Sequence, residues 1–457
     1  MNKNVFYVLL FSITLLGFVL RFKDYDTIPP FGNTMDELMY PWGGITFFQT
    51  GTPSSWTLLT TARKIEFITL WNNNFNIATP WVEKPPLYPL LTGAVSILAG
   101  QKTFDSIKLS TLRLIPLSLS VVAIFLTGLF AYTIFNRNVG LIAAIIYATT
   151  PTIAITNRLS LTENLLTPIS LFALWMTLKN WGKVFNLLKP YLLGILSGLA
   201  ILTRQLGIAL PITIIFILIN RRKVKDSVIV FIIAIALGAI YPLIGFYYGW
   251  EIFINVLKDY RQTYAIGLPE TIQNIFRFPM LMYQLEPFLD GTILAGYILI
   301  FSGPFIWVKN RLELFSYPLI YLIILAITES GKNIFGWHLY PLFPFIAIVL
   351  AKLLLEVWEN ANIYNLGFLF LILGSSSYRF LIQLIPPIQT FWQKGFILIL
   401  FTMIFIIFIN NKKYTKILLA TYFSLFLMIN ILFILNFGTL FSFITNVTHI
   451  TNVTHSP

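Results

Sequence analysis

Long apolar runs recur along almost the entire sequence, and most are long enough for a helix that crosses a hydrocarbon layer about 30 Å thick. The segment 189–220 is too long for one such helix and contains Arg204, so we interpret it as two short helices that meet near "TRQLG". We therefore expect an all-α polytopic membrane protein with roughly 13 transmembrane helices. The other runs lie at about 5–21, 109–135, 139–157, 164–182, 227–248, 290–308, 314–329, 338–356, 364–388, 393–410 and 415–437.

Composition agrees with this setting, because 57% of the residues are hydrophobic and only 11% are charged. A soluble domain with that balance would expose too much apolar surface to water. The first apolar run is followed by Arg21, Phe22 and Lys23 instead of a small-residue cleavage site, so we expect a retained first helix rather than a signal peptide. The absence of cysteine excludes disulfides, thiolate metal sites and cysteine nucleophiles.

The net charge of +13 is distributed over small basic clusters between the apolar runs. If the N-terminus is cytoplasmic and the runs alternate, every cluster falls on the inner side, as the positive-inside rule requires. This pattern argues against nucleic-acid binding. Only four of the 18 acidic residues fall inside, so we expect acidic chemistry on the exterior or periplasmic face of the plasma membrane. The basic clusters are "NRN" at 136, "KNWGK" at 179, "NRRKVKD" at 220, "KNRLE" at 309 and "NNKKYTK" at 410.

Two predicted outer loops, residues 22–106 and 249–289, are long, and long loops in compact proteins are usually functional or disordered. The first is rich in aromatic residues and prolines and contains an apolar stretch, 87–99, that is too short to span a bilayer. We therefore expect interfacial helices that lie along the membrane surface in this loop.

The first loop begins and ends with charged pairs that need explanation. Asp36 and Glu37 are adjacent in "TMDELMYPWGG", and mutual repulsion tends to raise the pKa of one of them. They are either solvated loop charges or a general base beside an acceptor hydroxyl. Glu83 and Lys84 precede two prolines in "EKPPLYPLL", which also contains Tyr88. The prolines should make a stiff corner that either aims the lysine or merely starts a helix.

Two further sites lie near the outer ends of predicted spans. In "ITNRLSLTENLL" a tight turn places Arg158 and Glu163 near the membrane boundary, and Glu163 either serves the first turn of the next helix or takes part in chemistry. Arg204 lies between two short apolar segments, where an arginine costs about 2.5–3.5 kcal/mol to insert. It either snorkels to the surface or binds an anionic head group.

The fifth site is "ESGKNIFGWHLYPLFPF", which combines Lys332, His338 and Tyr340 at the outer mouth of a span. His338 is the only histidine outside the C-terminal tail, so a multi-histidine metal site is excluded. The histidine is either an interfacial anchor or a contact to phosphate or substrate.

Together, "DE" early in the first outer loop, "EKPPLY" at its end, "RLSLTEN" at the next outer turn and a late aromatic-Pro-x-x-Pro helix resemble the GT-C superfamily. These are polytopic glycosyltransferases that use polyprenyl-phosphate sugars. Within this superfamily the chain is most similar to the branch of lipid A aminoarabinose transferases and protein O-mannosyltransferases. The resemblance covers most of residues 1–350 and implies a GT-C-like bundle with catalytic outer loops. It leaves 351–440 as variable transmembrane helices and 441–457 as a flexible outer tail.

By this resemblance Asp36 activates or orients the acceptor, and Lys84 and Arg204 lie near the lipid phosphate. Glu163 stands where the branch usually has a second acidic residue, commonly aspartate. A divalent metal through Glu83 is left open, because some members pair this residue with a histidine of the second large outer loop, and 249–289 contains none. We expect Asp36, Glu37 and Glu163 to be catalytic. Residues expected to bind substrate are Glu83, Lys84, Tyr88, Arg158, Arg204, Lys332, His338 and Tyr340.

The expected reaction moves a hexose or pentose from a polyprenyl- or dolichyl-phosphate to a hydroxyl of a protein, lipid or glycan, with inversion. A carboxylate would take the acceptor proton while cations stabilise the departing phosphate. No nucleotide-binding glycine motif is present, and no cofactor is required. Two alternatives remain: a transporter or flippase for polyprenyl-linked glycans, and a glycan polymerase or ligase. Transporters tend to show internal repeats that relate two halves of the chain, and this sequence shows no such symmetry between halves.

Overall fold

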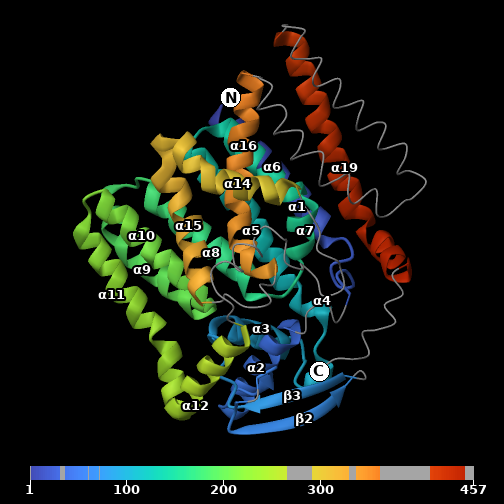
Figure 1. Ribbon diagram of the computed structural model, residues 1–457, viewed down its shortest axis with the longest axis vertical. Helices are drawn as coiled ribbons and strands as arrows, with labels where there is room; N and C mark the ends of the chain where they lie inside the picture. The colour runs from blue at the N-terminus through green and yellow to red at the C-terminus, as the bar shows by residue number, and fades with distance from the viewer. Residues whose placement is uncertain are drawn as a thin grey trace.

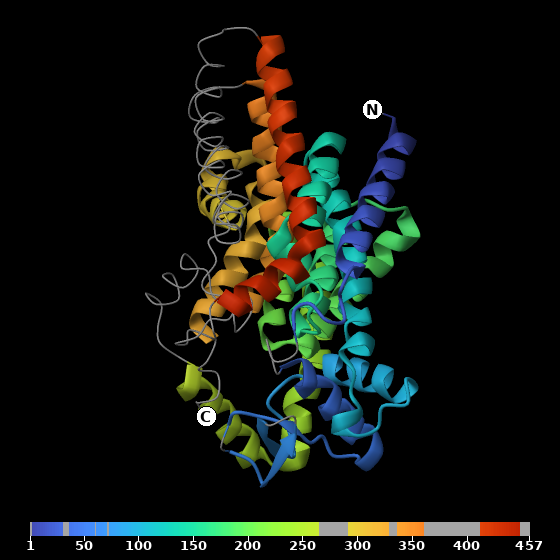
Figure 2. The same cartoon turned by 90° about the vertical axis from the view of Figure 1, so that its right-hand side faces the viewer.

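The computed structural model describes residues 2–30, 36–59, 61–70, 73–264, 291–328, 336–360 and 412–447. These residues form a multi-pass helical bundle with a small sheet and two short helices, α2 and α3, at one end (Figure 1). The N-terminus lies at the opposite end in both views (Figure 2). The protein is therefore an all-α membrane protein in its body, as the apolar runs predicted.

Six described helical segments are long and apolar enough to cross a bilayer, and several shorter apolar helices pack among them. The first half of the bundle consists of α1 (Lys3–Phe22), α4 (Leu109–Leu112), α5 (Leu114–Ile134), α6 (Arg137–Thr149), α7 (Pro151–Thr156), α8 (Thr162–Leu178), α9 (Lys183–Thr203) and α10 (Ala209–Asn220). The second half consists of α11 (Val224–Gly238), α12 (Ile240–Tyr264), α14 (Gly291–Ile306), α15 (Arg311–Thr328), α16 (Phe343–Glu359) and α19 (Lys412–Val447).

Local sequence explains where several helices start and stop. The side chain of Asn136 accepts a hydrogen bond from the backbone N–H of Val139, at 3.0 Å, and so caps α6. Thr150 is extended, as residues before proline usually are, and Pro151 then begins α7. The predicted run 139–157 is therefore two helices. Arg204 is also extended, with φ −160°, and separates α9 from the 3-10 helix η2 (Gln205–Ile208). The break predicted near "TRQLG" is confirmed.

The predictions near the end of the chain meet the structure only in part. Residues 249–264 of the predicted second outer loop continue α12, which kinks at Gly249, where φ is +127°. The rest of that loop, 265–289, lies outside the described residues, as do the predicted spans 364–388 and 393–410. α19 continues to Val447, so the segment 441–457 begins as helix, and residues 448–457 are again outside the described part.

The buried core runs through the centre of the bundle, where α5 packs against α6 and α8, and α16 packs against α6 and α14. Most apolar residues of α8 and α16 are buried, whereas α1 and α11 expose leucine, isoleucine, valine and phenylalanine side chains outward. Outward apolar side chains are what lipid-facing helices need. The central helices thus hold the polar sites at their ends in fixed positions.

The first outer loop contains α2 (Asp36–Thr50) and α3 (Leu87–Leu98), which confirms the predicted interfacial helices, and α3 matches the apolar stretch 87–99. It also contains a three-stranded antiparallel sheet of β1 (Ser55–Trp56), β2 (Lys64–Leu70) and β3 (Asn73–Thr79), in the order β1-β3-β2. Lys64 pairs with Thr79, and Leu70 pairs with Asn73. The sequence analysis missed this sheet, because β1 has only two residues and β3 is rich in asparagine, which is uncommon in strands.

The two loop helices approach each other closely at a pair of glycines. A Cβ atom on Gly44 would lie 2.0 Å from the carbonyl oxygen of Pro89, and one on Gly93 would lie 2.5 Å from the backbone of Gly44. Only hydrogen fits at this contact, so α2 and α3 pack backbone to backbone. This contact fixes the position of α2, whose first residue is Asp36.

Candidate active site

Asp36 and Glu37 occupy the first turn of α2, but their surroundings differ. Asp36 is partly exposed, whereas Glu37 is buried. The guanidinium of Arg113 donates two hydrogen bonds to the Glu37 carboxylate, at 3.0 and 2.7 Å, and the backbone N–H of Ser160 donates a third at 2.8 Å. Glu37 is thus fully engaged within the protein, and Asp36 is the carboxylate at the site.

The Glu83–Lys84 corner is held from several sides. The hydroxyl of Thr57 donates a hydrogen bond to one Glu83 carboxylate oxygen at 2.7 Å, and the Lys84 ammonium lies 3.0 Å from the other. The hydroxyl of Tyr241, on α12, lies 3.0 Å from the Glu83 carbonyl oxygen. These contacts, together with Pro85 and Pro86 ahead of α3, fix the direction in which Lys84 leaves the chain.

Glu163 and Arg204 form a buried ion pair between the first turn of α8 and the break after α9. The hydroxyl of Thr162 donates a hydrogen bond to the second Glu163 oxygen at 2.9 Å. Both charges are almost completely removed from water, and a buried charge needs such a partner. Glu163 therefore satisfies the charge of Arg204 and holds it in place.

Electrostatics brings these pairs into one neighbourhood around Asp36. Burial raises the pKa of the Asp36 carboxyl above its ordinary value. The cation of Lys84 lowers that pKa, the carboxylate of Glu83 raises it, Arg204 lowers it and Glu37 raises it. Shifts of this kind need charges within a few ångströms in a poorly solvated place. The structure thus brings together Asp36, Glu83, Lys84, Glu163 and Arg204, which are far apart in the sequence.

Tyrosines fill the space between α2 and the turn before α8. The Tyr88 and Ser160 hydroxyl oxygens lie 2.9 Å apart, and the Tyr40 side chain hydrogen-bonds to Thr162. The two tyrosine rings meet edge to face, with centroids 5.3 Å apart. Tyr88, which was predicted to bind substrate, is fully buried in this packing, and so its observed contacts are with the protein.

An apolar groove of about 250 Å³ has Lys84 in its lining. Its walls come from α2, α3, the end of α9 and α12, and include Phe47, Leu90, Leu202 and Ile244. Lys84 is its charged residue. A groove with apolar walls and a cation in its lining can accommodate a ligand with a hydrocarbon chain and an anionic head.

The remaining predicted substrate residues lie elsewhere or outside the described part. Arg158 is buried and donates to the carbonyl oxygens of Leu20 and Ile28, at 3.0 and 3.3 Å. His338 and Tyr340 are buried in the 3-10 helix η4 (Gly336–Leu342), which packs against α8. Tyr340 lies near Thr156 and Glu37, at the back of the site. Lys332 lies outside the described residues.

Arg113 was missed by the sequence analysis. It lies between α4 and α5 in what reads as one apolar run, and it is completely buried. An arginine inside an apolar run costs so much free energy that it needs a partner. Its presence there could therefore have pointed to an ion pair with one of the first-loop carboxylates.

The described residues contain no cluster of three histidine, aspartate or glutamate side chains that could hold a metal ion. Both carboxylate oxygens of Glu83 are already engaged, by Thr57 and Lys84. The described residues therefore add no support to the metal site that the sequence left open at Glu83.

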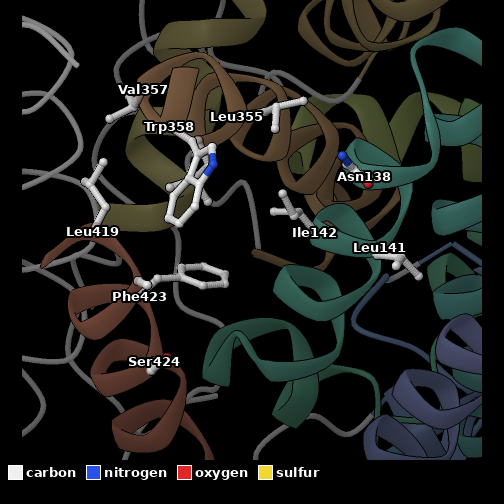
Figure 3. Close-up of a pocket in the computed structure, with 11 residues that line it drawn as sticks. Asn138, Leu141, Ile142, Leu355, Val357, Trp358, Leu419, Phe423 and Ser424 are labelled. Carbon is white, nitrogen blue, oxygen red and sulfur yellow. The ribbon is translucent and has the colours of Figure 1, made fainter. Parts of the chain in front are cut away.

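A second cavity, of about 420 Å³, lies between α6, α16 and α19 (Figure 3). Trp358 and Phe423 line it together with leucine and isoleucine side chains, and Asn138 is a polar residue at its edge. Its lining includes none of the charged residues around Asp36, so it is separate from the candidate site.

Comparison with known proteins gives one family match. A family model described as dolichyl-phosphate-mannose-protein mannosyltransferase matches residues 83–246, the segment that contains Glu83, Lys84, Glu163 and Arg204. A search of curated proteins found no match.

Several solved structures share the fold. ArnT from Cupriavidus metallidurans bound to undecaprenyl phosphate is 14% identical, with a TM-score of 0.56 over 94% of this chain and 77% of that chain. Its apo state gives 13% identity, a TM-score of 0.55 and the same coverage. The Archaeoglobus fulgidus oligosaccharyltransferase gives 13% identity and a TM-score of 0.49, over 79% of this chain and 51% of that chain. The chain is therefore similar to ArnT in its fold, and over residues 83–246 it is similar to the dolichyl-phosphate-mannose-protein mannosyltransferase family.

Proposed function

We propose that the protein transfers a hexose or pentose from a polyprenyl-phosphate donor to an acceptor hydroxyl on the extracytoplasmic face of the membrane. The observation that carries this proposal is the meeting of one carboxylate, Asp36, with two cations, Lys84 and Arg204, beside an apolar groove. The acceptor is a protein, a lipid or a glycan.

The groove supports a lipid donor. Its apolar walls would accommodate an isoprenoid chain, and Lys84, in the same lining, would bind the phosphate. ArnT, which shares the fold, was crystallised with undecaprenyl phosphate. Arg204 would share its charge between the Glu163 carboxylate and the donor phosphate, because an arginine offers several N–H donors in a planar fork.

The chemistry follows from the groups at hand. The Asp36 carboxylate takes the proton from the acceptor hydroxyl as its oxygen forms a bond to the anomeric carbon. The bond from that carbon to the phosphate oxygen breaks, and the electron pair stays on the polyprenyl phosphate. Lys84 and Arg204 stabilise the charge that develops there. A single displacement inverts the anomeric configuration, and a base with a raised pKa suits catalysis near neutral pH.

An assay in proteoliposomes separates this proposal from its alternatives. The purified protein is incubated with a panel of polyprenyl-phosphate sugars labelled in the sugar, and with candidate acceptors. The proposal expects label on an acceptor and release of unglycosylated polyprenyl phosphate. Label that crosses the bilayer while still attached to the lipid would identify a flippase instead, and transfer only of preformed oligosaccharides would identify a polymerase or ligase.

A further inference from the structure

The side chain of Arg113 reaches neither the groove nor solvent. It nevertheless makes four hydrogen bonds within the described part of the chain. Besides the two bonds to Glu37, its guanidinium donates to the carbonyl oxygens of Tyr25 and Pro29, at 3.0 and 2.7 Å. One buried side chain thus joins three segments: the break between α4 and α5, the chain that follows α1, and the start of α2. Its five N–H groups suit such a junction.

Glu37 extends this junction to the other half of the site. Its carboxylate accepts the backbone N–H of Ser160 as well as the two bonds from Arg113. Ser160 lies three residues before Glu163, and Glu37 lies one residue after Asp36. The same carboxylate therefore connects the two segments that carry the candidate base and the ion pair with Arg204.

We propose that Arg113 and Glu37 are positioning residues that fix the Asp36 carboxylate relative to the Glu163–Arg204 ion pair. The inference rests on the proposed function for its kinetic consequence, and it assigns Glu37 a different role from the catalytic one that the sequence suggested. Glu37 is only 2% exposed, and three hydrogen bonds occupy its carboxylate. It acts through Asp36 and Ser160 and does not touch the groove.

Two variants separate positioning from stability. Arg113→Lys keeps the charge but loses the planar fork that bonds both carboxylate oxygens and two carbonyls. We expect kcat to fall roughly 10- to 100-fold, because small displacements of a reacting group have effects of that size, while the donor KM changes less than about twofold. Glu37→Gln removes a negative charge from the neighbourhood of Asp36, where Lys84, Glu83 and Arg204 also act. We expect the acid limb of its kcat/KM profile to move to lower pH.

Arg21→Lys is the matched control. Arg21 is also completely buried, and it bonds the carbonyl oxygens of Gly17, Tyr147 and Ala148 and the side chain of Asn157. Because its hydrogen bonds go to carbonyl and amide oxygens, its variant should lose stability comparably yet keep the wild-type kcat and acid limb. Folded Arg113→Lys and Glu37→Gln proteins with wild-type kcat and an unmoved limb would overturn the proposal.

A distance measurement tests the junction without any assay of transfer. The chain has no cysteine, so Phe48→Cys on α2 and Phe172→Cys on α8, both exposed, allow one pair of spin labels. We expect the distance distribution to broaden or shift in the Arg113→Lys background and to stay unchanged in the Arg21→Lys background. Equal distributions in all backgrounds would refute the positioning role. If wild-type protein transfers no sugar from any donor, the proposed function fails. The spin-label distances would still show whether Arg113 fixes α2 relative to α8.

Discussion

Each of the two cations at the candidate site is paired with a carboxylate of its own. Asp36 is the proposed base, Glu83 orients Lys84, and Glu163 holds Arg204. Buried ion pairs add little net stability, because desolvation offsets the attraction between the charges. Their value here is geometric, since each carboxylate fixes the direction of one cation that the proposed reaction uses.

Lys84→Met should weaken donor binding. A hydrogen bond to a charged group contributes about 1.5–3 kcal/mol, so we expect the KM for the polyprenyl-phosphate sugar to rise roughly 10- to 100-fold. Lys102→Met is the control, because Lys102 is an exposed lysine of the same loop. Initial rates at varied donor concentration would measure both. An equal KM for the two variants would remove Lys84 from the phosphate site.

The pH dependence of transfer should follow Asp36. Its raised pKa places the acid limb of kcat/KM above the usual aspartate range, and activity falls as the pH drops through that value, because the protonated carboxyl cannot accept a proton. Lys84 lowers this pKa, so Lys84→Met should move the acid limb to higher pH. A limb that moves to lower pH or stays fixed would show that another group sets it.

The sequence carried the residue types of the site, but it could not show which groups pair. Asp36, Lys84 and Arg204 stood out because charges are rare in such a chain and expensive near a membrane. The bidentate pair of Glu37 with Arg113 joins residues 76 positions apart, and no local pattern encodes that choice. Adjacent carboxylates look alike in a sequence, and only the fold separates Asp36 from Glu37.

At the scale of elements, the site depends on how α2 lies against α3. The glycine contact lets the two backbones touch, and it fixes α2 relative to α3 and the Lys84 corner that precedes α3. The short helix α3 and the break at Arg204 were predictable from apolar length and from a charge inside an apolar run. The sheet was not, because β1 has only two residues and β3 carries four polar side chains among its seven residues, so neither shows a clear alternation.

Gly44→Ala should separate the two loop helices. The added methyl group meets backbone atoms that cannot move alone, and overpacking of this kind typically costs about 1–3 kcal/mol. We expect a lower midpoint of thermal unfolding in detergent, together with reduced transfer. The control is Gly182→Ala, because a Cβ atom there has no heavy atom within 4 Å. Equal midpoints for the two variants would contradict the close contact between α2 and α3.

At the scale of the whole molecule, the bundle presents the candidate site at one end and the N-terminus at the other (Figures 1 and 2). Apolar runs predicted this architecture well, because backbone groups in a bilayer must be satisfied within helices. Helix count was less predictable, since Pro151 and Gly249 divide or bend apolar runs that look continuous.

Sidedness is testable by labelling, because the chain has no native cysteine. Asp105→Cys lies in the first loop, and Lys225→Cys lies in the first turn of α11, within a basic segment; both positions are exposed. In intact cells, a membrane-impermeant maleimide should label the cysteine at 105 only, and permeabilised cells should show both. The opposite pattern would place the candidate site in the cytoplasm.

The central claim is that Asp36 accepts the proton of the acceptor hydroxyl, and single-turnover transfer from a bound polyprenyl-phosphate sugar tests it most directly. The comparison is between Asp36→Asn and Asp105→Asn, which removes an exposed aspartate from the same loop. We predict that Asp36→Asn lowers the rate by about 10²- to 10⁴-fold, the usual worth of a general base, and that Asp105→Asn transfers at the wild-type rate. A folded Asp36→Asn protein that transfers as fast as the wild type would contradict the account.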